Sequence, residues 1–214
     1  MRNVLATLAL LVLACACTVA QEAPKFNFNI GGGPTWPVQS ISDFATMSGN
    51  FVVGGGINLS KVFGVNAEYM YNNLPPKQGI VALTNATDGN ARLQSVTGNL
   101  ILHAPEKSKL GGYAIGGTGW YHRSWDLTNP ALTVGTVCLP SYVWWGIACT
   151  NGLVSTNVTV ASGSDNAIGW NIGGGLTYRL GESHAKFYTE LRYHVAYTKG
   201  VNTDVLPWTF GIRF

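Results

Sequence analysis

The last strand-like segment, residues 208–214, alternates apolar and polar residues and ends on a phenylalanine. Side chains on a strand repeat with period two, so all its large apolar side chains share one face. That face consists of Trp208, Phe210, Ile212 and Phe214, and the other carries Thr209, Gly211 and Arg213. An apolar outer face over a polar inner face is the reverse of a soluble protein, in which apolar side chains form the core. It is typical of a sheet that contacts lipid outside and encloses a polar lumen.

The same alternation recurs along the chain and predicts eight strands. They cover residues 25–36, 50–60, 63–73, 91–104, 110–126, 166–180, 186–198 and 207–214. The connections at 61–62, 105–109 and 181–185 are short, and those at 37–49, 74–90, 127–165 and 199–206 are longer. Outer-membrane barrels have short periplasmic turns and long external loops. The pattern therefore predicts an all-β fold, an eight-stranded antiparallel up-and-down transmembrane β-barrel.

Aromatic residues are expected to form two outward-facing belts at the two membrane interfaces. The belt near the short turns would contain Phe26, Phe63, Tyr113, Tyr178, Phe187 and Phe214. The belt near the long loops would contain Phe51, Tyr71, Tyr121, Trp125, Tyr197 and Trp208. A secreted soluble sandwich is the alternative, but it does not explain the alternating loop lengths. Segment 91–104 fits least well, because Leu93 and Ile101 fall on its polar face.

The N-terminus has the features of a secretory signal peptide. Arg2 precedes an apolar run at 4–14, and small residues before Gln21 suit cleavage. The run is too short for a spanning helix, which needs about 20 residues. We therefore expect a signal peptide at 1–20 and a barrel domain at 21–214, exported through the periplasm to the outer membrane. Lipid attachment at Cys15 or Cys17 is the alternative.

Composition argues against several other classes of protein. Charged residues make up 11% of the chain, against about 25% in soluble domains, and the formal net charge is only +3. No nucleic-acid partner is expected. The glycine triplets at 31–33, 54–56 and 173–175 lie within strand segments and open no helix, so they do not predict a phosphate loop. We expect them to mark bends in the strands or to make room for large neighbours. No cofactor or metal is expected.

Several ionisable residues fall on the inward face by parity. They are Glu68, Asp126, Arg179, Glu190, Arg192, His194 and Arg213. A charge in a narrow lumen is costly unless it is paired. The sequence therefore predicts a lumenal ion network, in which Glu68 and Glu190 face some of Arg179, Arg192 and Arg213.

Architecturally, the chain resembles the small outer-membrane barrels of Gram-negative bacteria, the OmpA/OmpX/OmpW-like group. Phe210, Ile212 and Phe214 resemble that group's C-terminal assembly signal, although Pro207 departs from its usual start. The resemblance implies a monomer with a structural or surface-interaction role and no catalysis. It also implies contact with outer-membrane lipid and lipopolysaccharide, and with the barrel-assembly machinery. The alternative is a narrow OmpW-like channel for a small solute.

A third hypothesis is a lipid A-modifying enzyme. His122 and Ser124 have the His-x-Ser spacing of outer-membrane lipid A deacylases, with Asp126 two residues further on. In those enzymes the pair faces lipid and a Glu supports it. Here parity is expected to place the pair inward, and no Glu lies between Glu106 and Glu182. We therefore do not expect catalysis.

The long connection 127–165 holds the only cysteines that follow the signal peptide. The periplasm is oxidising, so we expect a disulfide between Cys138 and Cys149. The ring it closes contains Tyr142, Trp144 and Trp145. Exposed apolar patches commonly mark interaction surfaces, so these residues are candidates for contact with a surface partner or lipid A. The alternative is that these residues fold down over the barrel mouth or pack on neighbouring loops.

Overall fold

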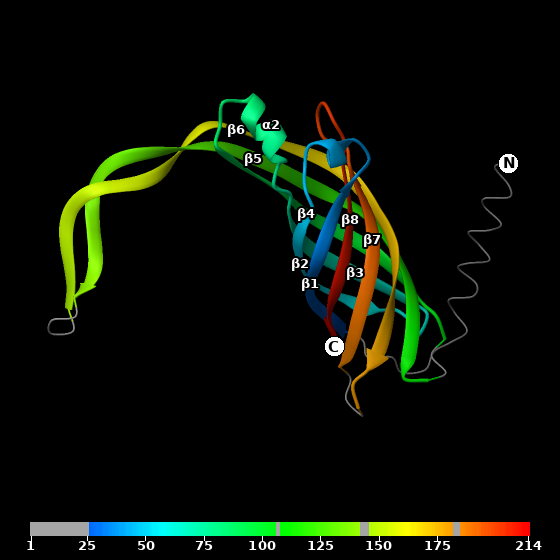
Figure 1. Ribbon diagram of the computed structural model, residues 1–214. Coiled ribbons are helices and arrows are strands. Elements are labelled where there is room, and N and C mark those ends of the chain that lie inside the picture. The colour runs from blue at the N-terminus through cyan, green and yellow to red at the C-terminus, as the bar shows by residue number, and fades with distance from the viewer. Residues whose placement is uncertain (1–25, 106–107, 142–145, 182–184) are drawn as a thin grey trace.

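A computed structural model describes residues 26–105, 108–141, 146–181 and 185–214 (Figure 1). Eight antiparallel strands form a closed barrel in sequence order, so the predicted fold class is confirmed. The strands are β1 Phe26–Val38, β2 Ser48–Asn58, β3 Phe63–Asn73, β4 Asp88–His103, β5 Leu110–Ser141, β6 Gly146–Arg179, β7 Lys186–Ala196 and β8 Thr203–Arg213. A 3-10 helix, η1, covers Gln39–Asp43, and α2 covers Gln78–Leu83. In the described part of the chain, neither helix has the length and apolarity to cross a membrane.

The barrel closes where the first strand meets the last. β1 pairs with β8 from Asn29↔Arg213 to Val38↔Asp204. Beyond this ladder the backbones of Phe28 and Phe214 exchange two hydrogen bonds, of 3.2 and 2.8 Å. The C-terminus lies at the end with the short connections, and η1 and α2 lie at the opposite end (Figure 1). By the rule for outer-membrane barrels, the end with η1 and α2 is external.

The outward face is apolar along most strands, as alternation predicts. Phe28 on β1 is 61% exposed and Ile172 on β6 is 59% exposed, whereas their inward neighbours Asn29 and Asn171 are each 2% exposed. On β8 the outward face carries Trp208, Ile212 and Phe214. Exposure of large apolar side chains on the outside is what a lipid-facing barrel requires.

The expected register of β5 is wrong by one residue. Tyr113 and Tyr121 point into the barrel, at 7% and 0% exposure, and Trp120 points outward at 47%. The expectation placed Tyr113, Tyr121 and Trp125 on the lipid-facing side of this strand. Because side chains alternate, His122, Ser124 and Asp126 lie on the outward face.

The inward tyrosines explain the two apolar residues on the polar face of β4. Leu93 packs in a buried cluster that contains Tyr121, and Ile101 packs with Tyr113 and Ile115. Aromatic rings inside a narrow barrel need apolar neighbours, and Leu93 and Ile101 supply them. Their inward placement therefore fits the strand.

The predicted loop 127–165 is also wrong, because β5 and β6 continue through it as a paired ribbon. The register runs from Leu127↔Ala161 to Ser141↔Gly146, with a shift between Leu127 and Thr128. We call residues 128–141 and 146–160 the arm. Figure 1 shows the arm, green to yellow, extending away from the barrel and curving. The arm contains two prolines and three glycines, which are typical of loops, but its Thr and Val residues favour strands.

Candidate functional site

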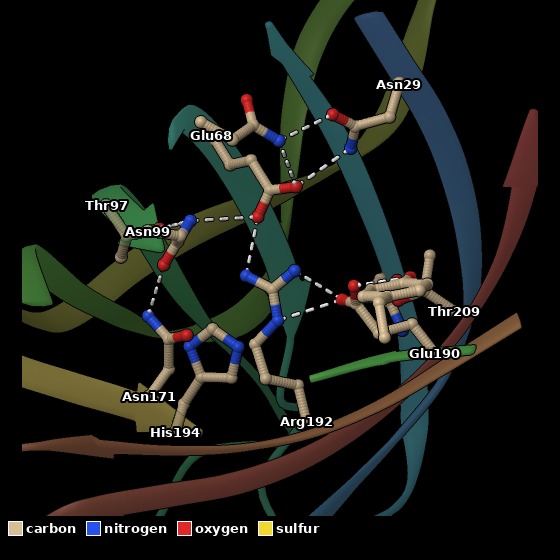
Figure 2. Close-up of polar contacts among 12 residues, drawn as sticks. Asn29, Glu68, Thr97, Asn99, Asn171, Glu190, Arg192, His194 and Thr209 are labelled. Carbon is tan, nitrogen blue, oxygen red and sulfur yellow. Dashed lines mark hydrogen bonds and ion pairs between the residues drawn. The ribbon is translucent and has the colours of Figure 1, made fainter. Parts of the chain in front are cut away.

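A network of paired charges crosses the barrel interior (Figure 2). Arg192 on β7 donates from Nη1 to Oε2 of Glu68 on β3, at 2.5 Å. Its Nε donates to Oε1 of Glu190 at 2.8 Å, and its Nη2 also bonds this oxygen. Arg213 on β8 lies 3.9 Å from the other Glu190 oxygen. The side chains in these pairs are 1–7% exposed, so two buried arginines balance two buried carboxylates.

Amide side chains surround Glu68 and satisfy its oxygens. Asn29 and Asn66 donate to Oε1 at 2.9 and 3.0 Å, and Asn99 donates to Oε2 at 3.1 Å. Asn171 in turn donates to Asn99 at 2.9 Å. Figure 2 shows these donors converging on the carboxylate from several strands. These donors hold the Glu68 carboxylate in one position, although Oδ1 of Asn66 and Oδ1 of Asn171 have no hydrogen-bond partner among the described residues.

Glu190 has a neutral partner that sequence reasoning placed elsewhere. The hydroxyl of Tyr113 donates to Oε2 of Glu190 at 2.8 Å. On the same side of the barrel, the Tyr121 hydroxyl lies 3.0 Å from Nδ1 of His194. Both tyrosines belong to β5, whose register was misassigned. The signal that could have placed them is the pair Leu93 and Ile101, since inward apolar residues need apolar neighbours.

Arg179 does not join the buried group. It has the inward parity of Thr177, but it lies at the last residue of β6 and is exposed. Asp126 was also expected inside and lies outside. It pairs with Arg92 at 3.4 Å near the external end, and the two side chains are 34% and 40% exposed.

Glycine gives the network the space it needs. A Cβ placed on Gly54 would lie 2.5 Å from Cγ of Glu68 and 2.8 Å from Oδ1 of Asn29. Any larger residue would displace the carboxylate or its amide donor. Gly54 thus makes room for a large neighbouring side chain, whereas a Cβ on Gly56 would meet the backbone of Val65 and Asn66.

Above the ion network, an apolar layer fills the external end of the barrel. Buried Ala45, Leu74, Leu93, Tyr121, Ala196 and Val205 form one cluster there. A pocket of about 80 Å³ lies beside it, lined in part by Ile41, Phe44 and Pro76. This volume is small, and most of its lining is apolar. The lumen therefore contains two layers. A layer of paired charged side chains lies inside, and an apolar layer covers it at the external end.

The His-x-Ser pair lies on the outer surface of β5. His122 stacks on Trp120, with ring centroids 5.7 Å apart, and its Nδ1 lies 2.7 Å from Oδ1 of Asn166. Ser124 is opposite Arg92 in the register. Outward placement removes one objection to the deacylase hypothesis. The other stands, because no carboxylate among the described residues is hydrogen-bonded to His122.

The arm carries the expected disulfide, which is confirmed between Cys138 and Cys149. These cysteines face each other in the β5–β6 register. The disulfide therefore ties the two strands of the arm together at its far end. Tyr142, Trp144 and Trp145, the expected contact residues, lie outside the described residues.

Solved structures of outer-membrane proteins share this fold. Neisserial surface protein A matches with a TM-score of 0.58 at 12% identity, covering 90% of this chain and 98% of that one. A major outer membrane protein from Thermus thermophilus gives 0.56 at 10% identity, with coverages of 90% and 99%. OprG from Pseudomonas aeruginosa gives 0.51 at 16% identity, with coverages of 91% and 97%. At these identities the likeness shows the fold alone. No curated protein matched the sequence.

The sequence itself carries the family assignment. Residues 6–214 match the family model described as the outer membrane protein beta-barrel domain. That match spans every strand of the barrel and agrees with the apolar outer face and the alternating connections. The chain therefore belongs to the outer membrane protein β-barrel domain family and resides in the outer membrane.

Proposed function

We propose that this protein is a non-catalytic outer-membrane barrel whose function is to hold the arm at the cell surface for contact with another molecule. One observation carries the proposal. β5 and β6 have 32 and 34 residues, whereas the other strands have 11 to 16. The excess forms a ribbon that the barrel does not need for spanning the membrane. A disulfide holds its far end, which limits the conformations it can adopt.

The arm presents side chains that the fold leaves uncovered. Leu132, Val134 and Leu153 lie well beyond the barrel and are 69%, 80% and 68% exposed. Val134 and Leu153 face each other in the register, so the three side chains form one patch. Exposed apolar patches of this kind mark interaction surfaces. Tyr142, Trp144 and Trp145, which follow the first strand of the arm in the sequence, would extend the contact to a partner or to lipid A.

The contents of the lumen favour this role over that of a channel. A conduit needs a continuous path, and here Arg192 bridges Glu68 and Glu190 across the interior. The apolar cluster around Leu93 and Tyr121 fills the external end. An OmpW-like route for a small solute would require both layers to move. The barrel is better suited to act as a rigid anchor.

Deletion of the arm tests the proposal. In the test variant an Asn-Gly turn replaces residues 128–160, which leaves the β5–β6 ladder of the barrel intact. As a control, a Gly-Ser linker replaces α2, a different external segment. Both variants should fold, seen as a shift of the unboiled band in SDS electrophoresis. We expect only the arm deletion to abolish binding of the purified protein to intact cells or lipopolysaccharide. Unchanged binding by the arm-deleted protein would contradict the proposal.

A further inference from the structure

The outer edge of β6 in the arm has no neighbouring strand among the residues that the structure describes. β6 pairs with β7 only from Gly169↔Ala196 toward the periplasmic end. On the other side of the ribbon, β5 pairs with β4 only as far as Thr128↔Asp88. Beyond these points the arm is two-stranded, and a two-stranded ribbon in water is marginally stable by itself. Unpaired edges of this length invite a further strand.

The alternation of the ladder shows which groups lie on each edge. The Cα atoms of Cys138 and Cys149 are 4.0 Å apart, the close spacing of a pair that exchanges no hydrogen bonds. The two kinds of pair alternate along an antiparallel ladder. Counting from Cys138↔Cys149, every second pair as far as Pro130↔Asn157 therefore also exchanges no hydrogen bonds. The backbone groups of these residues point away from the partner strand. On β6 they belong to Asn151, Leu153, Ser155 and Asn157.

The two edges of the arm differ in their ability to pair. The β5 edge includes Pro130 and Pro140, which have no backbone N–H to donate. Proline on an edge is one of the devices that block further pairing. The β6 strand of the arm contains no proline and has every edge donor. Only the β6 edge is therefore open to a full ladder.

The arm also lacks the charges that usually protect an edge. Residues 127–164 contain no Asp, Glu, Lys, Arg or His. Charged side chains keep natural edges apart, and their absence removes both repulsion between identical arms and any steering of a charged partner. The stretch 153–161 is rich in Val and Thr, which favours strand pairing. An uncharged, proline-free edge is complementary to itself.

We propose that two copies of this chain join along the β6 edges of their arms, in antiparallel register about a two-fold axis, to form a four-stranded sheet. The proposal rests on the arm being the contact surface and names the partner as a second copy. It departs from the expected monomer. Such a contact is isologous, with the same patch on both copies. The membrane holds the arms of neighbouring copies at one height, which raises their effective concentration. If the two-fold axis is normal to the sheet, the apolar patches formed by Leu132, Val134 and Leu153 in the two copies lie on the same face of that sheet.

A proline on each edge tests the pairing. Ser155→Pro removes a donor from the β6 edge without removing a β5–β6 hydrogen bond. Thr136→Pro does the same on the β5 edge and serves as the control. By sedimentation in detergent, the wild-type protein and Thr136→Pro should be dimers. Ser155→Pro should raise the dissociation constant at least about tenfold, because the dimer contains the change twice. A monomeric wild-type protein, or an equally dimeric Ser155→Pro, would overturn the proposal.

Hydrogen exchange provides a second measurement that needs no substitution. In the dimer the amides of Leu153, Ser155 and Asn157 should exchange more slowly at high protein concentration than at low. The amides of Leu132 and Val134 on the β5 edge should not change. Equal exchange at both concentrations would overturn the dimer. Cell binding by a monomeric protein, lost on arm deletion, would leave the proposed function standing while the dimer fails.

Discussion

Arg192 and Glu68 are 124 residues apart in the sequence and lie 2.5 Å apart inside the barrel. The contact joins β7 to β3 across the lumen, so it depends on closure of the whole sheet. Arg192 also bonds Glu190 two residues away on its own strand. One guanidinium thus serves both buried carboxylates.

Removal of this arginine should be strongly destabilising. Arg192→Met leaves Glu68 and Glu190 buried without their main cation, and we expect a loss of roughly 3 to 5 kcal/mol in the free energy of unfolding. Arg92→Met is the matched control, because Arg92 and Asp126 form an exposed pair worth at most about 1 kcal/mol. Urea unfolding in lipid vesicles measures both. Similar losses for the two variants would contradict the buried network.

The wild-type barrel should not conduct ions. The paired charges at Arg192 and the apolar cluster at Tyr121 occupy successive levels of the lumen. Planar bilayer recordings with purified protein should remain at baseline, under conditions in which a known porin gives steps. Reproducible steps that vanish when the lumen is blocked would favour the channel instead.

The disulfide should stabilise the arm and leave the barrel unaffected. Cys138→Ser together with Cys149→Ser removes a cross-link worth about 3 kcal/mol to the segment that it closes. We expect faster protease cleavage within 128–160 and an unchanged heat-dependent shift in electrophoresis. Mass spectrometry of the fragments locates the cuts. If the arm resists protease equally without the disulfide, its order comes from elsewhere.

The outward His-x-Ser pair should have no catalytic role. His122 is hydrogen-bonded to Asn166, and no carboxylate among the described residues orients it as a base would require. Ser124→Ala should therefore leave the acylation of lipopolysaccharide unchanged in expressing cells. Mass spectrometry of lipid A is the direct readout. A change in acyl chain number on this substitution would establish the enzyme hypothesis.

Period-two alternation was enough to predict the fold, because a lipid-facing barrel needs one apolar face on each strand. On β5 the choice of the outward face was wrong, because Tyr113 and Tyr121 point into the lumen. Their hydroxyl groups bond Glu190 and His194 there. Aromatic identity alone does not distinguish these two environments. The partners Glu68, Glu190 and Arg192 could be predicted from parity, but their pairing required the closed sheet.

The arm could not be predicted from local signals. Pro130, Pro140 and the glycines at 135 and 152 are typical of loops. Their strand pairing depends on the opposite strand, with Gly135 facing Gly152 in the register. The predicted disulfide between Cys138 and Cys149 was the one sequence feature that placed two separate parts of this segment side by side.

Accessibility from outside the cell tests most directly whether the barrel displays the arm at the surface. Thr133→Cys places a single free thiol on the exposed arm, and Lys61→Cys places one in the short turn between β2 and β3. The native cysteines are joined and do not react. On intact cells a membrane-impermeant maleimide should label Thr133→Cys but not Lys61→Cys, which should react only after the outer membrane is permeabilised. Labelling of the short turn on intact cells, with an arm that reacts only after permeabilisation, would contradict the account.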